Sequence, residues 1–292
     1  MAQLRQIKWL YLFALAFIWG SSFILIKKGL LGFSPLQVAS LRIVLTAIII
    51  LAAGFFSLKR INRKQWPWVI LTGFIGTFFP ATFFAFAIDE IDSAIASILN
   101  SLVPLNTIII GLTVFKLACT RRQFFGVIIG FLGTLTLIIS GAQLNPDQNY
   151  LFAGLVIMAT LCYAFNVNII KRYLQDVPAI AIATGNFVGI IVPGLLMLVL
   201  SGFFKAETLN GSFFWESLAY IFLLATFGTA LAKVLFNKLV QISTPVFASS
   251  VTYLITVVAL GWGILDGERF SLIQGLATTL IFLGVYLSNR KK

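Results

Sequence analysis

The chain alternates long apolar runs with short polar segments, and ten of the runs are long enough for a helix that crosses a lipid bilayer. Such a helix needs roughly 20 mostly apolar residues, and it satisfies its own backbone hydrogen bonds in lipid. The pattern therefore predicts an all-α membrane protein with ten transmembrane helices. They cover roughly residues 9–26, 35–57, 66–88, 92–115, 122–141, 150–170, 179–201, 214–239, 244–265 and 271–288.

The sequence also contains an internal repeat. A shift of 152 positions lays Gly76–Gly111 without a gap on Gly228–Gly263. Identical pairs include Gly76/Gly228, Thr77/Thr229, Phe84/Phe236 and Ser97/Ser249. At a different offset, WGSSFILIKK, which begins at Trp19, also lines up with YAFNVNIIKR, which begins at Tyr163.

The repeat divides the chain into two predicted five-helix halves, residues 1–143 and 144–292. Because five is an odd number, the second half must lie inverted in the membrane relative to the first. In secondary transporters, inverted repeats place the substrate site near the midplane, and rocking of one repeat against the other gives alternating access. We therefore expect a lined cavity between the two halves.

Composition supports a membrane location, because 60% of the 292 residues are hydrophobic and only 10% are charged. Soluble domains carry about a quarter charged residues. The net charge of +12 is then a topology signal: with a cytoplasmic N-terminus, sixteen of the 21 Lys and Arg residues lie on or near the cytoplasmic side. This bias predicts cytoplasmic N- and C-termini, an integral protein of a bacterial inner (plasma) membrane, and no nucleic-acid partner.

Missing residue types exclude several classes of function. The sequence has no histidine, which removes HExxH metal hydrolysis and serine catalysis with a histidine base. Cys119 falls in a predicted loop and Cys162 in a predicted span, so no disulfide framework is available. No Walker A motif is present, and no acid sits in the middle of a span. We expect no enzyme, cofactor or metal site, and facilitated transport or exchange follows more naturally than tight proton coupling.

Predicted spans four and nine carry stripes of small and polar residues. Asn100 and Pro104 share one face of span four, and span nine contributes Thr252 and Tyr253. Pro104 removes a backbone hydrogen bond in mid-span, which is tolerated where protein or a wet cavity satisfies the freed carbonyl. We interpret these four residues as cavity-lining. The alternative is that small residues let the helices pack closely.

Spans one and six carry matching aromatic and polar residues. Trp19 and Ser22, like Tyr163 and Asn166, are three positions apart and share one helix face. An aromatic ring beside a hydrogen-bonding group can stack on and orient a small organic substrate, whereas the alternative for Trp19 is an interfacial belt. Two weaker aromatic candidates on span three, with lipid or core contact as their alternative, are Phe79 and Phe83.

Two cations lie inside predicted spans. Burying either at a helix centre costs about 2.5–3.5 kcal/mol. Lys233 shares a stripe with Thr229 and Asn237, and Arg42 lies in span two. Either cation can hold a substrate carboxylate or phosphate. The alternatives are that Lys233 snorkels to a headgroup and that Arg42 packs against a carbonyl or the other repeat.

Several of these segments together resemble a known family. They are WGSSFILIK, the pair Pro35 and Arg42, ASILNSLVPL in span four, its counterpart ASSVTYLITV in span nine, and GER at 267–269. The chain resembles EamA-type members of the drug/metabolite transporter superfamily. The resemblance implies ten helices, a central cavity lined by helices one to four and six to nine, and often export of amino acids or related metabolites. The chain departs from the family pattern at Leu117, Lys233 and Thr256.

We therefore expect a secondary transporter of small organic metabolites that works by alternating access. A cavity with aromatics, amides and one or two cations favours outward movement of amino acids or related zwitterionic or anionic compounds. Sugar phosphates, nucleotide sugars and lipid headgroups stay open as substrates. The alternatives are a flippase or scramblase for a lipid-linked substrate and, in a different class, a membrane-embedded enzyme. Gly126, Gly130 and Gly133 form a close-packing face that joins helices within one chain or in a homodimer.

Overall fold

The computed structural model describes residues 2–114, 121–144 and 147–289 of the 292. Leu117 and Cys119 lie outside the described residues. Every regular element within those residues is helical. In chain order they are α1 (Ala2–Gly29), α2 (Pro35–Gly54), η1 (Phe55–Arg60), α3 (Trp66–Gly73), η2 (Phe74–Phe78), α4 (Phe79–Glu90), α5 (Ser93–Asn100), α6 (Val103–Thr113), α7 (Arg121–Leu144), η3 (Tyr150–Phe152), α8 (Ala153–Tyr173), α9 (Ala179–Leu200), α10 (Ala206–Leu209), α11 (Phe214–Leu223), η4 (Leu224–Leu231), α12 (Ala232–Ile242), α13 (Pro245–Ser249), α14 (Val251–Leu265) and α15 (Leu272–Asn289).

Eight helical segments of the described chain are long and apolar enough to cross a membrane. They are Ile7–Gly29, Pro35–Arg60, Trp66–Glu90, Ser93–Thr113, Tyr150–Tyr173, Ala179–Leu200, Phe214–Ile242 and Pro245–Leu265. The two other predicted spans coincide with α7 and α15, whose apolar stretches Ile128–Ser140 and Leu272–Gly284 are shorter. The all-helical membrane architecture is confirmed, and the count of ten spans stays a prediction.

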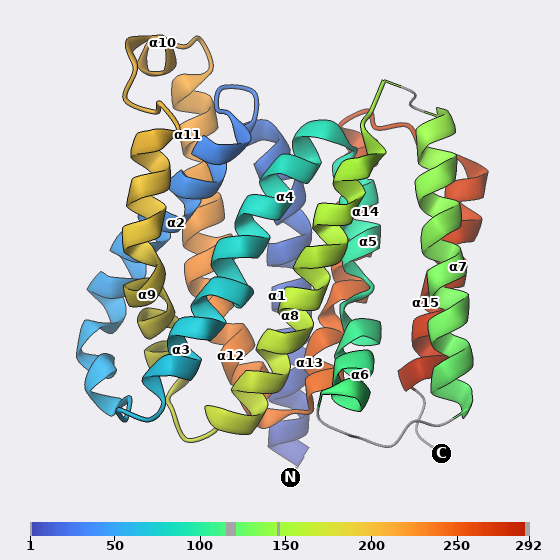
Figure 1. Cartoon of the computed structure of the whole chain (residues 1–292), viewed down its shortest axis with the longest axis horizontal. Helices are drawn as coiled ribbons and strands as arrows, with labels where there is room; N and C mark the ends of the chain where they lie inside the picture. The colour runs from blue at the N-terminus through green and yellow to red at the C-terminus, as the bar shows by residue number, and fades with distance from the viewer. Residues whose placement is uncertain (1, 115–120, 145–146, 290–292) are drawn as a thin grey trace.

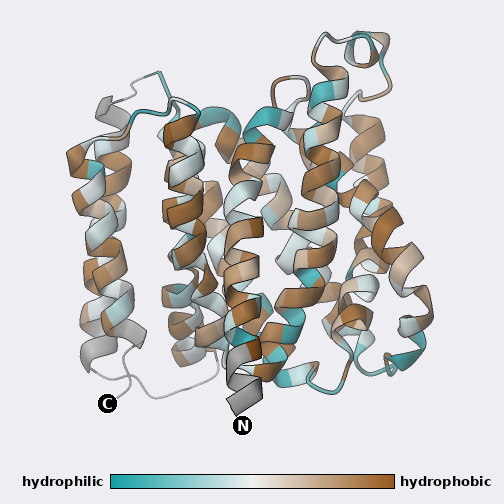
Figure 2. Ribbon diagram, turned by 180° about the vertical axis from the view of Figure 1, so that it is seen from behind, coloured by the Kyte–Doolittle hydropathy of each residue, from teal (hydrophilic) through white to brown (hydrophobic). Residues whose placement is uncertain are grey.

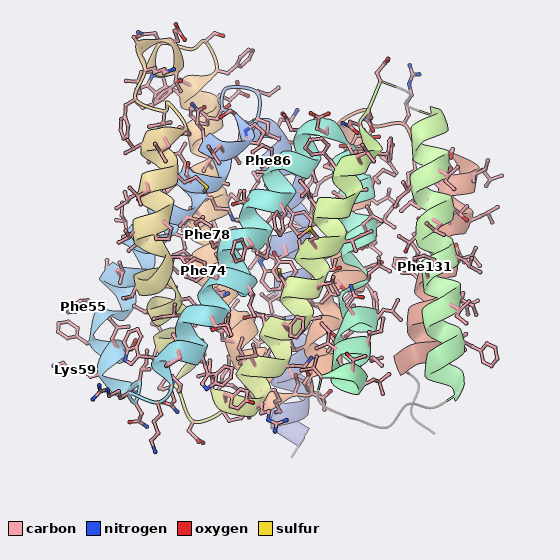
Figure 3. All side chains as sticks on the ribbon, in the orientation of Figure 1. Phe55, Lys59, Phe74, Phe78, Phe86 and Phe131 are labelled. Atoms are coloured by element: carbon pink, nitrogen blue, oxygen red, sulfur yellow. The ribbon has the colours of Figure 1, made fainter. Side chains whose placement is uncertain are left out.

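The helices stand side by side, with the two chain ends at the same end of the bundle (Figure 1). Apolar residues cover the helix faces, while polar residues gather in the connections at the two ends (Figure 2). Side chains such as Phe55 and Phe131 point away from the bundle, and they are 60% and 58% exposed (Figure 3). An apolar belt between two polar ends is the surface that a bilayer requires.

Local sequence signals set where several helices begin and break. Ser34 caps α2, since its hydroxyl accepts from the Gln37 backbone N–H while the Gln37 side chain accepts from the Ser34 N–H, and Pro35 fills the first turn. The predicted span four is broken between α5 and α6, and Pro104 lies in the first turn of α6. Proline therefore ends the first half of this span, as its missing N–H predicts.

Two π-helical segments, η2 and η4, interrupt the third span of each half at positions that the repeat makes equivalent. A π-helical turn has one extra residue and a wider backbone, and such turns often lie at functional sites. Each segment contains one of the repeated Gly-Thr pairs, Gly76-Thr77 or Gly228-Thr229.

The glycine face of predicted span five packs against another helix of the same chain, since α7 lies along α15 (Figure 1). A Cβ atom built on Gly133 would lie 2.9 Å from the Ile281 backbone N, and one on Gly284 would meet the backbone of Gly126 and Gly130. Glycine on both helices thus allows the two backbones to approach closely. A homodimer stays a prediction.

Candidate functional site

A cavity lined by both polar and apolar side chains lies inside the bundle, with a volume of about 90 Å³. Both predicted halves contribute side chains to it, from α1, α2, η2, α4, α5, α6, α8, η4, α12, α13 and α14. A single water needs roughly 10–15 Å³ on this scale, so the cavity holds several waters or one small solute. Nine of the predicted site residues line it: Trp19, Ser22, Arg42, Asn100, Tyr163, Asn166, Thr229, Lys233 and Thr252.

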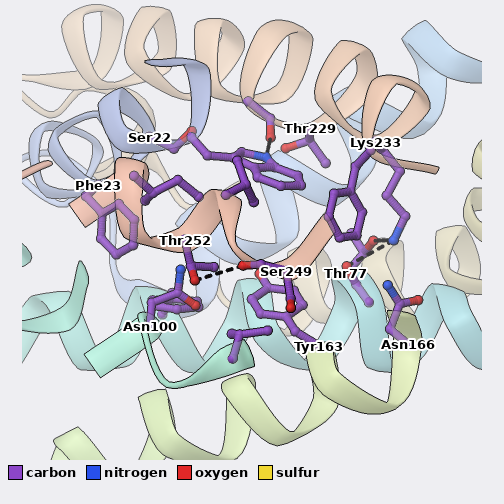
Figure 4. Close-up of a pocket in the computed structure, with 18 of the residues that line it drawn as sticks. Ser22, Phe23, Thr77, Asn100, Tyr163, Asn166, Thr229, Lys233, Ser249 and Thr252 are labelled. Carbon is purple, nitrogen blue, oxygen red and sulfur yellow. Dashed lines mark hydrogen bonds between the residues drawn. The ribbon is translucent and has the colours of Figure 1, made fainter. Parts of the chain in front are cut away.

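The π-helical turn of the first half binds a cation from the second half. Pro80 has no N–H, so the Gly76 carbonyl lacks its usual helical partner four residues along the chain. Lys233 of α12 donates to this carbonyl at 3.0 Å and to the Thr77 hydroxyl at 2.8 Å (Figure 4). The lysine side chain therefore turns into the cavity, and only 5% of the residue is exposed. It does not reach the bilayer surface in this structure.

The π-helical turn of the second half makes the reciprocal contacts with the first. The Trp19 indole N–H donates to the Gly228 carbonyl at 2.9 Å, and Arg42 Nε donates to the Thr229 hydroxyl at 2.8 Å. Trp19 thus lies at the cavity and not in an interfacial belt. Each Gly-Thr pair offers a carbonyl and a hydroxyl oxygen to donors of the opposite half, and this use explains why the pair occurs twice.

The missing side chain of Gly76 brings two polar groups together. A Cβ at this position would lie 2.5 Å from Asn166 Oδ1 and 2.8 Å from Lys233 Nζ, so any larger residue displaces them. Asn166 is 2% exposed and Asn100 is 5% exposed. The Oδ1 atom of each is buried without a hydrogen-bond partner. Buried polar atoms normally have partners, so these two oxygens are free to accept from a solute.

Aromatic rings form much of the cavity wall. Phe84 contacts Phe23 edge to face at a centroid distance of 5.5 Å and lies stacked with Tyr163 at 6.3 Å. Its repeat partner, Phe236, contacts Trp19 edge to face at 5.0 Å. In Figure 4, Lys233, Thr77 and Asn166 lie together, apart from Phe23 and Asn100. Lys233 therefore lies toward one end of the cavity, and Phe23 and Asn100 lie toward the other.

Five predicted site residues lie outside this cavity. Phe79 is 40% exposed and stacks with Phe83. Tyr253 turns toward α15, where its ring contacts Phe282. Pro104 is buried in the first turn of α6, and the Asn237 amide donates to the Ala179 carbonyl at the start of α9. Pro104 and Asn237 therefore make contacts of helix packing.

The sequence interpretation missed several lining residues, among them Gly76, Thr77, Phe84, Gly228, Phe236 and Ser249. The repeat carried a usable signal for most of them. Thr77 is the partner of the selected Thr229, and Gly76/Gly228 and Phe84/Phe236 are identical pairs. A residue that is identical in both copies of the repeat and adjacent to a selected residue is itself a candidate for the cavity lining.

An ionic cluster joins the two halves at the end of the bundle opposite the chain termini (Figure 1). Lys27 of α1 contacts Asp266 at 2.8 Å and Glu268 at 2.9 Å. Glu268 also accepts from the Ser93 hydroxyl at 2.6 Å and from the Ala94 N–H at 2.9 Å, which caps α5. We call Lys27, Ser93, Asp266 and Glu268 the ionic latch.

With Lys28, which also contacts Asp266, two lysines and two carboxylates meet at the latch. Burial alone raises the pKa of Asp266, but hydrogen bonds from Lys27 and Lys28 outweigh it and lower that pKa below its ordinary value. The carboxylates of the latch therefore have cationic partners. By contrast, none of the described residues that line the cavity is acidic, although Arg42 and Lys233 both face it.

The fold and the site define a helical membrane protein with an internal cavity that residues from both predicted halves line. The family model for the EamA-like transporter family matches residues 6–139 and again residues 151–290. The chain belongs to the EamA-like transporter family.

Similar proteins include "Uncharacterized inner membrane transporter YedA" of Escherichia coli K12, which is 27% identical over 94% of this chain and 88% of that protein. A Salmonella typhimurium protein named "Probable amino-acid metabolite efflux pump" is 28% identical over 93% of this chain and 91% of that protein. A solved crystal structure of a protein with 16% identity has the same fold, with a TM-score of 0.65 over 99% of this chain and 97% of the other.

Proposed function

We propose that the protein is a secondary transporter that moves small carboxylates, above all amino acids and related zwitterions, out of the cell. The observation that carries the proposal is the charge of the cavity. Arg42 and Lys233 face it, and none of its described lining residues is acidic. A solute carboxylate supplies the missing negative charge, because an opposite charge nearby stabilises a cation in a medium of low dielectric constant.

The remaining cavity groups fit the other parts of such a solute. The unpartnered Oδ1 atoms of Asn100 and Asn166 can accept from an ammonium group. Rings such as Phe84 and Phe236 can contact an apolar or aromatic side chain. The name of the Salmonella relative supports amino-acid export, and that of the Escherichia relative supports an inner-membrane location.

For the mechanism we propose alternating access by two inverted halves, with both termini in the cytoplasm. The cross-half bonds of Lys233 and Trp19 hold the halves together at the cavity. The ionic latch holds them at the end away from the termini. Release of the latch with retention of the cavity contacts would open the cavity to the external side.

The test is counterflow in proteoliposomes with a panel of radiolabelled L-amino acids and, in parallel, glucose 6-phosphate. We expect at least one L-amino acid with an apolar or aromatic side chain to exchange, and we expect Arg42→Met to abolish that exchange. Lys238→Met, an exposed lysine on α12, is the matched control and should exchange like the wild type. Movement of glucose 6-phosphate with no movement of any amino acid would refute the proposed substrate class.

A further inference from the structure

The cavity holds two basic side chains close to each other. Arg42 donates to the Thr229 hydroxyl, and Lys233 lies four residues after Thr229 on the continuous helix formed by η4 and α12. Side chains at this spacing lie on the same helix face. Both groups line the same cavity, where like charges repel each other, and the described lining residues provide no carboxylate to offset the repulsion.

Other titratable groups do not change this balance. Of the helices packed against α12, α9 carries no titratable side chain, and α1 contributes only Trp19, Ser22, Phe23 and Ile26 to the cavity. α8 contributes Tyr163, a phenol that is neutral near pH 7. Lys171, at the end of α8, binds backbone carbonyls that include Ser243 O at 2.7 Å. Arg42 of α2 is therefore the charge that Lys233 faces.

Only one of the two cations can relieve the repulsion by losing a proton. An arginine stays protonated in proteins, whereas a buried lysine can become neutral. The hydrogen bonds of Lys233 fit the neutral form, because its two acceptors, Gly76 O and Thr77 Oγ1, match the two hydrogens of an amine. If Lys233 is protonated, the ammonium has a third hydrogen to donate. Asn166 Oδ1 lies nearby, has no hydrogen-bond partner and can accept it.

We propose that the cavity is also a proton site: Lys233 is a neutral amine when the cavity is empty and takes up one proton from the adjoining aqueous phase when a carboxylate enters. The amine nitrogen gains the proton, water supplies it, and no bond to the solute forms. This inference rests on the proposed function for the identity of the anion. The protonation state of Lys233 in the empty cavity does not depend on it. It differs from the sequence-based expectation, in which facilitated transport or exchange follows more naturally than tight proton coupling.

Coupling of this kind has a defined consequence for transport. Each solute then crosses together with one proton, so a pH gradient drives the solute toward the more alkaline side. With an alkaline cytoplasm, export needs an outward solute gradient large enough to exceed that effect. The affinity for a carboxylate also falls about tenfold per pH unit once the empty site is deprotonated, as linkage to one proton requires.

The first test needs no substrate. The melting temperatures of the purified wild type, Lys233→Met and Lys238→Met are measured in detergent from pH 7 to 9.5. An unfolded lysine keeps its proton up to a pKa of about 10.4, so a lysine that is neutral in the folded state makes stability rise with pH over this range. We expect the melting temperature of the wild type to rise relative to Lys233→Met and to run parallel to that of Lys238→Met.

A constant difference between the wild type and Lys233→Met over this range would overturn the proposal, because it would show a lysine that stays charged. The second test measures the half-saturation concentration for L-phenylalanine exchange at pH 7, 8 and 9 in proteoliposomes. We expect a steep increase with pH in the wild type and in Lys238→Met, and a flat profile in Lys233→Met. A wild-type slope in Lys233→Met would also overturn it. If L-phenylalanine does not move in any of the proteins, an amino acid that does exchange replaces it; if no amino acid exchanges, the proposed substrate class fails and the melting experiment alone decides the proton site.

Discussion

Replacement of Gly76 by alanine tests the cavity contacts most sharply, because the added Cβ would lie 2.5 Å from Asn166 Oδ1 and 2.8 Å from Lys233 Nζ. Heavy atoms do not stay that close, so Asn166 and the end of the Lys233 side chain must shift, and the bonds of the lysine to Gly76 O and Thr77 Oγ1 are weakened or lost. Two lost hydrogen bonds cost about 1–3 kcal/mol, against a gain of about 0.5–1 kcal/mol from alanine in a helix.

We expect Gly76→Ala to lower the melting temperature and to weaken solute exchange, because it displaces Asn166 and Lys233 at the cavity. A loss of about 1–3 kcal/mol in solute binding corresponds to about 5- to 150-fold. The matched control is Gly154→Ala on α8, where a new Cβ meets nothing within 4 Å. That variant should keep wild-type exchange and gain slightly in stability. The two variants are compared by differential scanning fluorimetry and by L-phenylalanine counterflow. Equal behaviour of Gly76→Ala and Gly154→Ala would refute the contact between the π-helical turn and Lys233.

Three further predictions concern the cavity and the latch. Asn100→Leu fills the cavity and should block exchange with little change in melting temperature; a misfolded product would make Asn100 a packing residue instead. Gly263→Ala places a Cβ 2.5 Å from Glu268 Oε2 and should destabilise the protein by about 1–3 kcal/mol through loss of the α5 cap, whereas Gly261→Ala, in open space, should not. The folded state lowers the pKa of Asp266, so the ionised carboxylate stabilises the fold above about pH 4, and this stabilisation is lost as the pH falls further. In melting experiments below about pH 4, the wild type should therefore lose stability faster than Asp266→Asn.

Much of the fold could be predicted from the sequence, because in lipid an apolar run of sufficient length has one stable backbone conformation. Single-residue signals at Pro104 and Pro35 also located a helix break and a helix start. The irregular turns were harder. The repeated Gly-Thr pairs lie in the two π-helical turns and accept from donors of the opposite half, and those donors are distant in sequence.

The site could be predicted in part. Trp19 and Tyr163 could be selected because the repeat places them at equivalent positions. Phe79 could not be separated from the other 28 phenylalanines, since lipid and cavity both accept an aromatic ring. The face that a helix turns inward is decided by its neighbours, as the packing of Tyr253 against Phe282 illustrates.

The central claim is that the cations of the cavity bind the carboxylate of an organic solute. The most direct measurement is competition against radiolabelled L-phenylalanine counterflow by two fragments of that molecule, at pH 7. 3-Phenylpropanoate keeps the carboxylate and lacks the amine, whereas 2-phenylethylamine keeps the amine and lacks the carboxylate. We predict that the carboxylate inhibits at least about tenfold more strongly, a difference of about 1.4 kcal/mol. Stronger inhibition by the amine would contradict the claim.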